Sequence, residues 1–500
     1  MTGIVRNLTA SAALLCGLAV FAFSGRALGS GDVVTGEFAP LKTYASQKGV
    51  LKVTLDAAPK TVEIGGVSVK ALTFNGTYGA PLLRLKPGDQ LKIHLLNHTG
   101  ELLNLHFHGF HASPLGRGDN IHAVVKQGQA FDYTLNIPKT QPSGLFWYHT
   151  HIHGIAEEQI NRGLSGAIVV EGLENQAPEI AGAKERLLVL KTYSDPTSAD
   201  PAMKPLHGVV QSINGAAHTT LVAQTGRTEF WRISNQSAND YFHLSMKGVH
   251  FHVVAMDGYR LNADVDQDSL DIAPAGRVEA LVRFDKAGDY SLRSGSTPTG
   301  SGKSLKPYRE LASVTVVGQD QASPPPVIGQ TRAPLAPDLS AAAVDTRRTV
   351  VFSQKPGEEV YFIDGRVYDH DRMDVRVPLG SVQEWTIRND TDDMHVFHIH
   401  QVHFQVMSIN GEPVAGNGRI DTVRVPERGF VVVRIAFTDP RILGKFLFHC
   451  HVLKHEDKGM MANIEVYDPR RKTPPPNQDL FGFPICTTPP AQGLKLRASL

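Results

Sequence analysis

The sequence has little of what marks disulfide-rich, nucleic-acid-binding or membrane-spanning proteins. Three cysteines among 500 residues cannot form a disulfide framework. Fifty basic and 49 acidic residues leave a formal net charge of +1, so no summed positive field exists to hold nucleic acid or an anionic membrane surface. We expect no nucleic-acid partner, no stable membrane insertion and a monomeric protein. With 41% hydrophobic and 20% charged residues, the composition is that of an ordinary globular chain, long enough for about three domains.

Long apolar runs are also scarce, and the clearest one lies at the start of the chain. It extends over residues 10–23, follows Arg6 and leads into small residues near position 29. This run of about fourteen residues is shorter than the roughly 20 that span a bilayer, and the pattern is typical of a cleaved signal peptide. We predict a signal peptide over residues 1–29 and a periplasmic or secreted protein, with an uncleaved anchor as the alternative. Because Cys16 lies in this segment, the mature chain would keep Cys450 and Cys486.

The rest of the chain consists of short strand-like segments separated by Gly, Pro and Asn turns. Residues 91–95, 167–170 and 430–435 are examples, with alternating or continuous β-branched and apolar residues. Helical periodicity is scarce. We therefore predict an all-β fold built from sandwich domains.

One sequence pattern occurs three times, beginning at Gly88, Gly226 and Gly380. Each copy runs through a polar strand that ends at Asn and then, after a short loop, reaches a strand that contains histidine. Copies about 140–155 residues apart indicate three related domains. We place the three domains at residues 35–172, 173–318 and 346–468. A linker rich in Pro, Ala and Gln is expected at residues 319–345, and an irregular tail at residues 469–500.

Histidine is what the sequence has in abundance, and its 22 histidines are bunched. On a strand, residues i and i+2 project on the same face, so a His-x-His pair offers two imidazoles to one ion. Neutral imidazole binds copper, zinc, iron and nickel. One such pair is weak evidence, whereas four clusters indicate a metal centre. The clusters are His106-Phe107-His108, His149-Thr150-His151, His395-Val396-Phe397-His398-Ile399-His400, and His449-Cys450-His451-Val452-Leu453-Lys454-His455 followed by Met460.

The last cluster carries the most specific signal. A thiolate and two imidazoles with a weak axial thioether are the ligands of a blue copper site. Cys450, His455 and Met460 supply three of them, and His395 supplies the fourth. The two histidines that flank Cys450 must point to the opposite face of a strand. The alternation predicts one metal on each side of a single short peptide.

The four motifs, in this order in a chain with three repeats, resemble those of the three-domain multicopper oxidases, the family of laccases, bilirubin oxidases and bacterial cuprous oxidases. The resemblance covers nearly the whole mature chain and implies three cupredoxin-like Greek-key β-sandwich domains. It also implies four copper ions, with the trinuclear cluster between the first and third domains. The implied ligands are His395, Cys450, His455 and Met460 for type 1 copper, His106 and His398 for type 2, and His108, His149, His151, His400, His449 and His451 for the type 3 pair.

The middle repeat keeps the pattern without the ligands. Ser245 aligns with His400, which breaks the histidine pair and predicts a spacer domain. The segment 250–252 resembles another clamp, but it aligns with residues 403–405, outside the implied ligands, and we interpret it as structural. Three further histidines lie close to implied ligands in the sequence, and we interpret them as supporting or surface residues: His111, His122 and His153.

The resemblance implies an oxidase that couples one-electron oxidation of phenols or aromatic amines to the four-electron reduction of dioxygen to water. Protons must reach a buried cluster, and carboxylates are the usual relays. Asp119 and Glu456 match the acids of the family, although Asp119 stands slightly farther from His108 than the family pattern requires. Asp421 has a family-like context, with a purely structural role in a loop as the alternative. Lys454, beside His455, is expected to bias which donors approach.

Other readings of the clusters remain open. A cuprous or ferrous oxidase serving copper tolerance often carries a methionine-rich segment, and the nine methionines here are dispersed, which disfavours it. A noncatalytic copper carrier or store needs neither a second cluster nor a carboxylate relay. A zinc hydrolase would have no use for Cys450 with Met460. Copper nitrite reductases have two domains per chain and lack the His-Cys-His arrangement.

Overall fold

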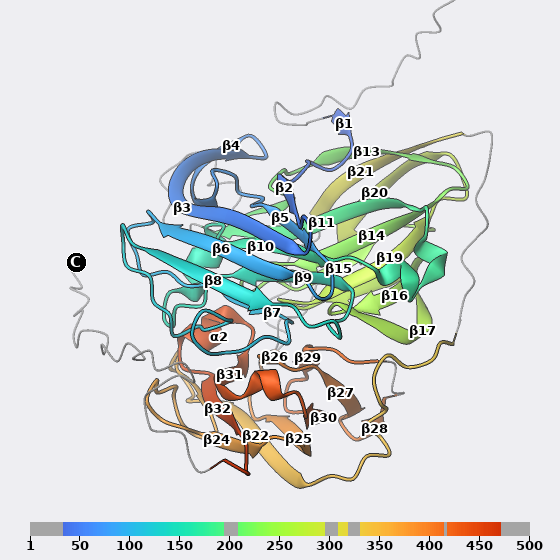
Figure 1. The fold of residues 1–500 in the computed structure, drawn as a ribbon. Helices are drawn as coiled ribbons and strands as arrows, with labels where there is room; N and C mark the ends of the chain where they lie inside the picture. The colour runs from blue at the N-terminus through green and yellow to red at the C-terminus, as the bar shows by residue number, and fades with distance from the viewer. Residues whose placement is uncertain (1–33, 195–208, 296–308, 319–330, 415–417, 472–500) are drawn as a thin grey trace, which may run out of the picture.

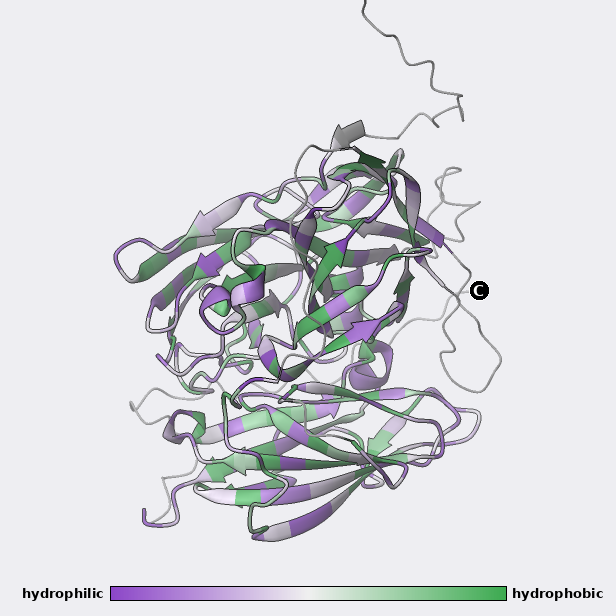
Figure 2. Ribbon diagram, turned by 90° about the vertical axis from the view of Figure 1, so that its right-hand side faces the viewer, coloured by the Kyte–Doolittle hydropathy of each residue, from purple (hydrophilic) through white to green (hydrophobic). Residues whose placement is uncertain are grey.

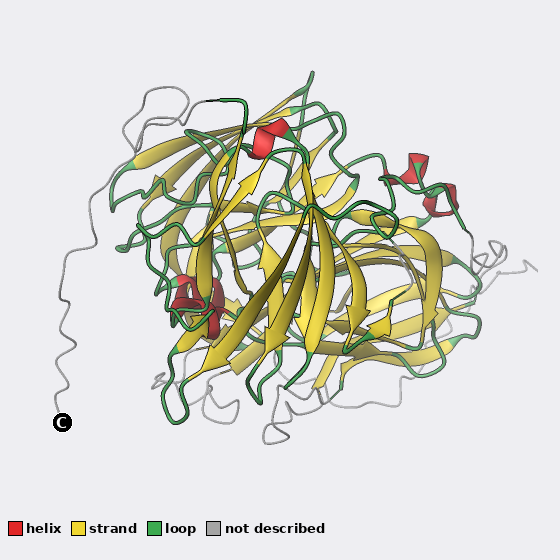
Figure 3. Cartoon of the chain, turned by 90° about the horizontal axis from the view of Figure 1, so that it is seen from below, coloured by secondary structure: helices red, strands yellow, loops and turns green. Residues whose placement is uncertain are grey.

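The computed structural model describes residues 34–194, 209–295, 309–318, 331–414 and 418–471. Nearly all regular structure in them is β-strand, with two short α-helices, α1 (Ala156–Asn161) and α2 (Leu453–Asp457) (Figures 1 and 3). The all-β prediction is confirmed. The expected signal peptide, Cys16, Cys486, and most of the expected linker and tail lie outside the described residues. No helix in the described part of the chain is both long and apolar enough to cross a membrane.

The first sandwich packs a four-stranded sheet against a five-stranded sheet. The first sheet has the order β4 (Val67–Phe74), β3 (Val50–Ile64), β6 (Gln90–Asn97) and β8 (Ala130–Asn136). The second has the order β2 (Thr43–Ala45), β5 (Leu82–Leu85), β10 (Ser165–Val170), β9 (Gly144–His149) and β7 (His106–His108). In β6, Leu91, Ile93 and Leu95 are buried and alternate with more exposed residues, so this strand has one core face.

The second sandwich has two six-stranded sheets. One has the order β12 (Val209–Ile213), β11 (Lys184–Ser194), β14 (Thr228–Asn235), β19 (Arg277–Arg283), β16 (Phe251–Met256) and β17 (Tyr259–Gln267). The other has the order β1 (Val34–Gly36), β13 (Thr219–Gln224), β21 (Arg309–Val317), β20 (Gly288–Ser294), β15 (Phe242–Ser245) and β18 (Ser269–Ile272). Strand β1 therefore pairs outside the first sandwich, although the sequence places residue 35 at the start of the first domain.

The third sandwich has a six-stranded and a five-stranded sheet. The larger has the order β23 (Tyr361–Ile363), β22 (Thr346–Gln354), β25 (Ser381–Asn389), β30 (Phe430–Phe437), β27 (Phe404–Ile409) and β28 (Glu412–Pro413). The smaller has the order β24 (Val375–Pro378), β32 (Met461–Tyr467), β31 (Gly444–Cys450), β26 (His395–Ile399) and β29 (Thr422–Val425). The three strands expected at 91–95, 167–170 and 430–435 are found within β6, β10 and β30.

The three sandwiches repeat one topology. Strand β3 pairs in parallel with β6, as β11 does with β14 and β22 with β25. Because parallel neighbours need a crossover connection, the chain passes to the other sheet between each such pair. Apolar and polar residues alternate along many of the strands (Figure 2), and each sandwich has its own large apolar cluster. The threefold sequence pattern is therefore a threefold structural repeat.

The third sandwich lies against both others, with β7 and β26 close to the boundary (Figure 1). One small apolar cluster at this junction takes a residue from each sandwich: Ile160, Ala238 and Leu453. The Asp457 carboxylate also crosses the junction and accepts backbone hydrogen bonds from Gly154 and Glu157 at 2.8 and 2.7 Å. These contacts fix the first and third sandwiches face to face.

Candidate metal centres

Two equivalent strand pairs face each other where the first and third sandwiches meet. In the first, β7 pairs with β9 so that His106 lies opposite His149. In the third, β26 pairs with β31 so that His398 lies opposite His449. The two pairs of strands bring their imidazoles into direct contact, with ring centroids 3.7 Å apart for His106 and His400. All eight histidines of the two strand pairs are buried.

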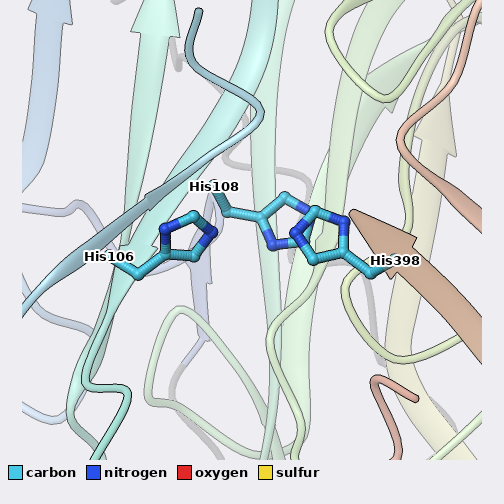
Figure 4. A group of neighbouring side chains, drawn as sticks. All are labelled: His106, His108 and His398. Atoms are coloured by element: carbon cyan, nitrogen blue, oxygen red, sulfur yellow. The ribbon is translucent and has the colours of Figure 1, made fainter. Parts of the chain in front are cut away.

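The eight histidines form three groups, two of which share His108, and each group has three ring nitrogens close enough for one metal ion. Within each group the donor atoms lie within 4.8 Å of one another. Figure 4 shows the first group, in which the rings of His108 and His398 stack with centroids 3.8 Å apart. The groups are His106, His108 and His398; His108, His149 and His451; and His151, His400 and His449.

In three of these rings a hydrogen bond occupies one nitrogen and leaves the other free for a metal. The Nδ1 atoms of His106, His149 and His398 lie 3.1, 2.8 and 2.8 Å from oxygens of Asp119, Thr150 and Asp421. Their Nε2 atoms are buried and have no protein partner. A buried polar atom without a partner is costly, so the residues present fit metal ions at these positions.

His108 is oriented the other way round. Its Nε2 lies 3.1 Å from Oδ1 of Asp421, and its buried Nδ1 has no partner in the protein. A metal ion would therefore meet His108 at Nδ1.

Burial lowers the pKa of His108, and of the other seven histidines, below the ordinary value. The rings are neutral at physiological pH, which is the form that binds metals.

A fourth group consists of His395, Cys450 and His455 and lies within the third sandwich. The Nδ1 atoms of the two histidines are 3.0 Å apart and lie 3.4 and 3.7 Å from the Cys450 sulfur. Nε2 of His395 lies 2.8 Å from the Thr391 hydroxyl, so its Nδ1 faces the sulfur. Met460 is buried in the same apolar cluster as Cys450, whose N–H donates to the Met460 carbonyl at 3.1 Å.

Burial raises the pKa of the Cys450 thiol to about 12 in the metal-free chain. A bound cation stabilises the thiolate and offsets this shift. Strand β31 thus directs Cys450 into one group, whereas His449 and His451 belong to the histidine groups on its other side. This geometry is the one that alternation along a strand predicts.

Two buried carboxyl groups contact the histidine groups from outside. Asp119 accepts hydrogen bonds from the Phe107 N–H and the Gln401 amide at 2.9 and 2.8 Å, in addition to its contact with His106. Glu456 lies 2.8 Å from Nδ1 of His449 and 3.6 Å from Nδ1 of His151. Burial raises the pKa of both carboxyl groups to about 7. Both can therefore hold or release a proton near neutral pH.

The middle sandwich contributes a residue that the sequence reasoning missed. Arg277 of β19 donates to both carboxylate oxygens of Asp421, at 2.8 and 2.6 Å, and Asp421 in turn contacts His108. Burial opposes ionisation of Asp421, but the guanidinium holds its pKa below the ordinary value. In the sequence, the only sign of this role is that an arginine stands at the start of an apolar strand. Asp421, considered only as a family-like or loop residue, thus links all three sandwiches.

The alignment of the middle repeat requires a correction. Ser245 pairs with Ser269 in β18 as His398 pairs with Thr422 in β29. Ser245 therefore takes the place of His398, and the alignment with His400 was wrong by two residues. The loop differs in length, since Ser245 follows Asn235 by ten positions and His398 follows Asn389 by nine. No metal-ligand group of three or more residues occurs in the described part of the middle sandwich.

The five histidines interpreted from the sequence as structural, supporting or surface residues lie outside the four groups. His250 and His252 contact carboxylates of Asp268 and Asp264 at 2.8 and 3.0 Å. The others contact aromatic or imidazole rings: His111 with His403, His122 with His370, and His153 with Tyr368.

The family is shown by comparison with known proteins. Family models described as multicopper oxidase match residues 56–175, 146–317 and 336–470. The chain belongs to the multicopper oxidase family, which implies copper as the metal.

Its relatives span more than one kind of protein. The chain is 26% identical to multicopper oxidase mco of Staphylococcus haemolyticus, covering 79% of this chain and 83% of that protein. It is also 26% identical to the cell division protein FtsP of Edwardsiella tarda, covering 81% and 87%. A structure of the laccase-like oxidase CueO from Ochrobactrum superposes with a TM-score of 0.72 at 26% identity, covering 86% of this chain and all of that one. A metallo-oxidase from Campylobacter jejuni shares the fold, with a TM-score of 0.73 at 24% identity and coverage of 87% and 95%.

Proposed function

We propose that this protein is an exported, laccase-like oxidase that removes single electrons from phenols or aromatic amines and reduces dioxygen to water. The observation that carries the proposal is β31, which directs Cys450 and its two flanking histidines into separate metal-ligand groups. The residues that would hold copper are those that the family resemblance implies, including Met460. Export rests on the apolar segment before residue 29, and the four-ion content rests on the four donor groups.

Bound copper would supply reversible one-electron storage, which allows single-electron donors to complete a four-electron reduction. The chain's own residues then have separable tasks. His455 and His395 hold the position beside Cys450 where an electron enters, and β31 provides a short covalent path from Cys450 to the histidine groups.

Reduction of one dioxygen to water consumes four protons. Asp119 and Glu456 carry protons near neutral pH, because burial raises the pKa of each to about 7. Each contacts a histidine of the buried groups. We assign them to proton delivery.

The choice of donor rests on two observations. The Ochrobactrum relative is described as active towards lignin model compounds and lignosulfonate, and this chain has nine dispersed methionines. Both favour organic donors over cuprous or ferrous ions. A noncatalytic role is the alternative of another class, and the intact donor groups disfavour it.

Oxygen uptake by the copper-loaded protein tests the proposal. We expect rapid uptake with 2,6-dimethoxyphenol, and none with metal-free protein as the control. Uptake with cuprous ion but not with the phenol, after subtracting the spontaneous reaction of cuprous ion with oxygen, would assign a metal oxidase instead. No uptake with either donor by fully loaded protein would contradict an oxidase.

A further inference from the structure

An aromatic side chain covers the histidine at which the proposed electron entry takes place. Tyr361, the first residue of β23, stacks on the ring of His455 with centroids 4.2 Å apart and an angle of 28° between the rings. The exposed fraction of Tyr361 is 4% and that of His455 is 7%. The exposed edge that a donor would use is therefore narrow.

The backbone around Tyr361 is held against the loop that carries the metal ligands. Its N–H donates to the Lys458 carbonyl at 3.1 Å. Gly459 follows with a φ of +112°, and a Cβ there would lie 2.8 Å from the Tyr361 carbonyl oxygen. Glycine is thus required where this loop passes β23. The close fit holds the backbone of Tyr361 against this loop.

Surface charges add a second tether. The Glu359 carboxylate binds the ammonium groups of Lys454, at 2.6 Å, and Lys458. Both lysines flank His455 in the sequence. The ion pairs are exposed, so each contributes little by itself, but together they join the segment before β23 to helix α2.

No other described aromatic residue stacks on His455. The neighbouring imidazole of His395 lies on the inner side, with centroids 4.7 Å apart and an angle of 63° between the rings. His395 is fully buried. Tyr361 is therefore the aromatic side chain that covers His455 on the side away from His395 among the described residues.

We infer that Tyr361 is a specificity-determining residue, which limits direct contact with His455 to donors narrow enough to use its exposed edge. The inference rests on the proposed function and names the class of donor, namely small phenols in preference to wide ones. Each phenol loses one electron to the site and one proton to water, and the phenoxyl radical leaves. Tyr361 is neither oxidised nor reduced in this step.

The covering of His455 can be measured without copper. Diethyl pyrocarbonate acylates accessible imidazole, and peptide mass mapping of the metal-free chain reports the rate at His455. In Tyr361→Val we expect this rate to rise about tenfold, because the ring becomes open to solvent. Tyr361→Phe keeps the stack and should match wild type. Tyr368→Ala is the matched control, since Tyr368 packs at 4.8 Å against His153, which is outside the donor groups. Equal rates in Tyr361→Val and wild type would overturn the inference.

The donor profile of the loaded protein is the second measurement. For Tyr361→Val we expect kcat/KM to rise about tenfold for the wide donor ABTS and to change little for hydroquinone, as steric discrimination of this size predicts. The blue absorption band should stay unchanged. If acylation shows that His455 is uncovered in Tyr361→Val but the donor preference is unchanged, the specificity inference alone is overturned. If the loaded protein oxidises no donor at all, the proposed function is contradicted. If Tyr361→Val does not fold, Glu359→Gln serves as the second variant, because it loosens the same segment. We expect it to raise both the acylation rate of His455 and the oxidation of ABTS, each by less than the tenfold expected for Tyr361→Val. No rise in either quantity would overturn the inference.

Discussion

The third and middle sandwiches share one topology but differ in what fills the ligand positions. Strand β31 corresponds to β20, and β26 corresponds to β15, by sheet order and by pairing register. Where the third sandwich has imidazole and thiolate ligands, the middle one has residues that cannot form the site. Phe242, Ser245, Arg293 and Ser294 take the positions of His395, His398, His449 and Cys450.

The described part of the middle sandwich thus has the same topology without a metal-ligand group. Phe242 is buried in the core of the middle sandwich, where its ring supplies apolar contact in place of a ligand. The middle sandwich instead contributes charge, through Arg277, to the junction. Function thus lies in the side chains that the repeated framework carries.

Cys450→Ser gives the third sandwich the residue of the middle one. A hydroxyl does not replace a thiolate as a copper ligand, so we expect loss of the blue band and donor oxidation at the level of the metal-free control. Absorption and oxygen uptake measure both. A retained blue band would show that Cys450 is not the ligand.

Arg277→Met removes the charge that the middle sandwich contributes. Asp421 would be left buried without its partner, and we expect the free energy of unfolding to fall by about 3–5 kcal/mol. Denaturant unfolding measures the change. Arg388→Met is the control, because Arg388 and Asp390 form an exposed pair that contributes little to stability. Adding Asp421→Asn should recover part of the loss; a loss no larger than in the control would refute this role.

Glu456→Gln retains the shape of the side chain and removes its acid–base function. We expect dioxygen turnover to slow by about 100-fold, while reduction of the blue site by donor without oxygen proceeds as in wild type. Stopped-flow absorption separates the two steps. Asp119→Asn should act in the same direction. Unchanged turnover in both variants would remove the carboxyls from proton delivery.

The metal-free protein should lose stability as pH falls from about 6.5 towards 4. Burial lowers the pKa of His395 to about 3 and that of His449 to about 4, so these rings stay neutral in the folded state while unfolded histidines bind protons. The unfolded state then binds more protons, and stability increases with pH. Buried carboxyl groups oppose this trend, because burial raises the folded-state pKa of Asp257 to about 6 and that of Asp119, Glu456 and Asp457 to about 7. The buried histidines with a lowered pKa outnumber these carboxyl groups: they are His395, His455 and the eight of the three histidine groups. Urea unfolding at pH 5 and pH 6.5 tests the sign; greater stability at pH 5 would contradict it.

His243→Gln should have the smallest effect. The alignment of Ser245 with His400 would also align His243 with His398. In the structure, the pairing of β15 with β18 makes His243 a partly exposed partner of Asp271, at 2.6 Å. We expect a change in unfolding free energy below about 1 kcal/mol and an unaltered blue band. Loss of copper in this variant would contradict the placement of His243 outside the metal-ligand groups.

The sequence allowed much of the fold and site to be predicted, because both depend on local patterns. Alternation along strands predicted the sandwiches, and the His-x-His spacing predicted which rings share a face. The four clusters are indeed brought together, although no single cluster indicates its partner. That step came from family resemblance.

What could not be predicted depends on contacts between distant segments. Arg277 reaches Asp421 from 144 positions away, and Tyr361 of β23 covers His455 of helix α2. Neither pair has a local motif. The ring orientation of His108 likewise follows from Asp421, and the register of β15 follows from a loop one residue longer than its counterpart.

Copper content together with the absorption spectrum of the loaded wild-type protein tests the central claim most directly. If β31 separates two metal sites, the chain should bind one copper for each donor group, four in all, and show an intense band near ~600 nm from the Cys450 thiolate. Fully loaded protein without that band, or with a single copper per chain, would contradict the account.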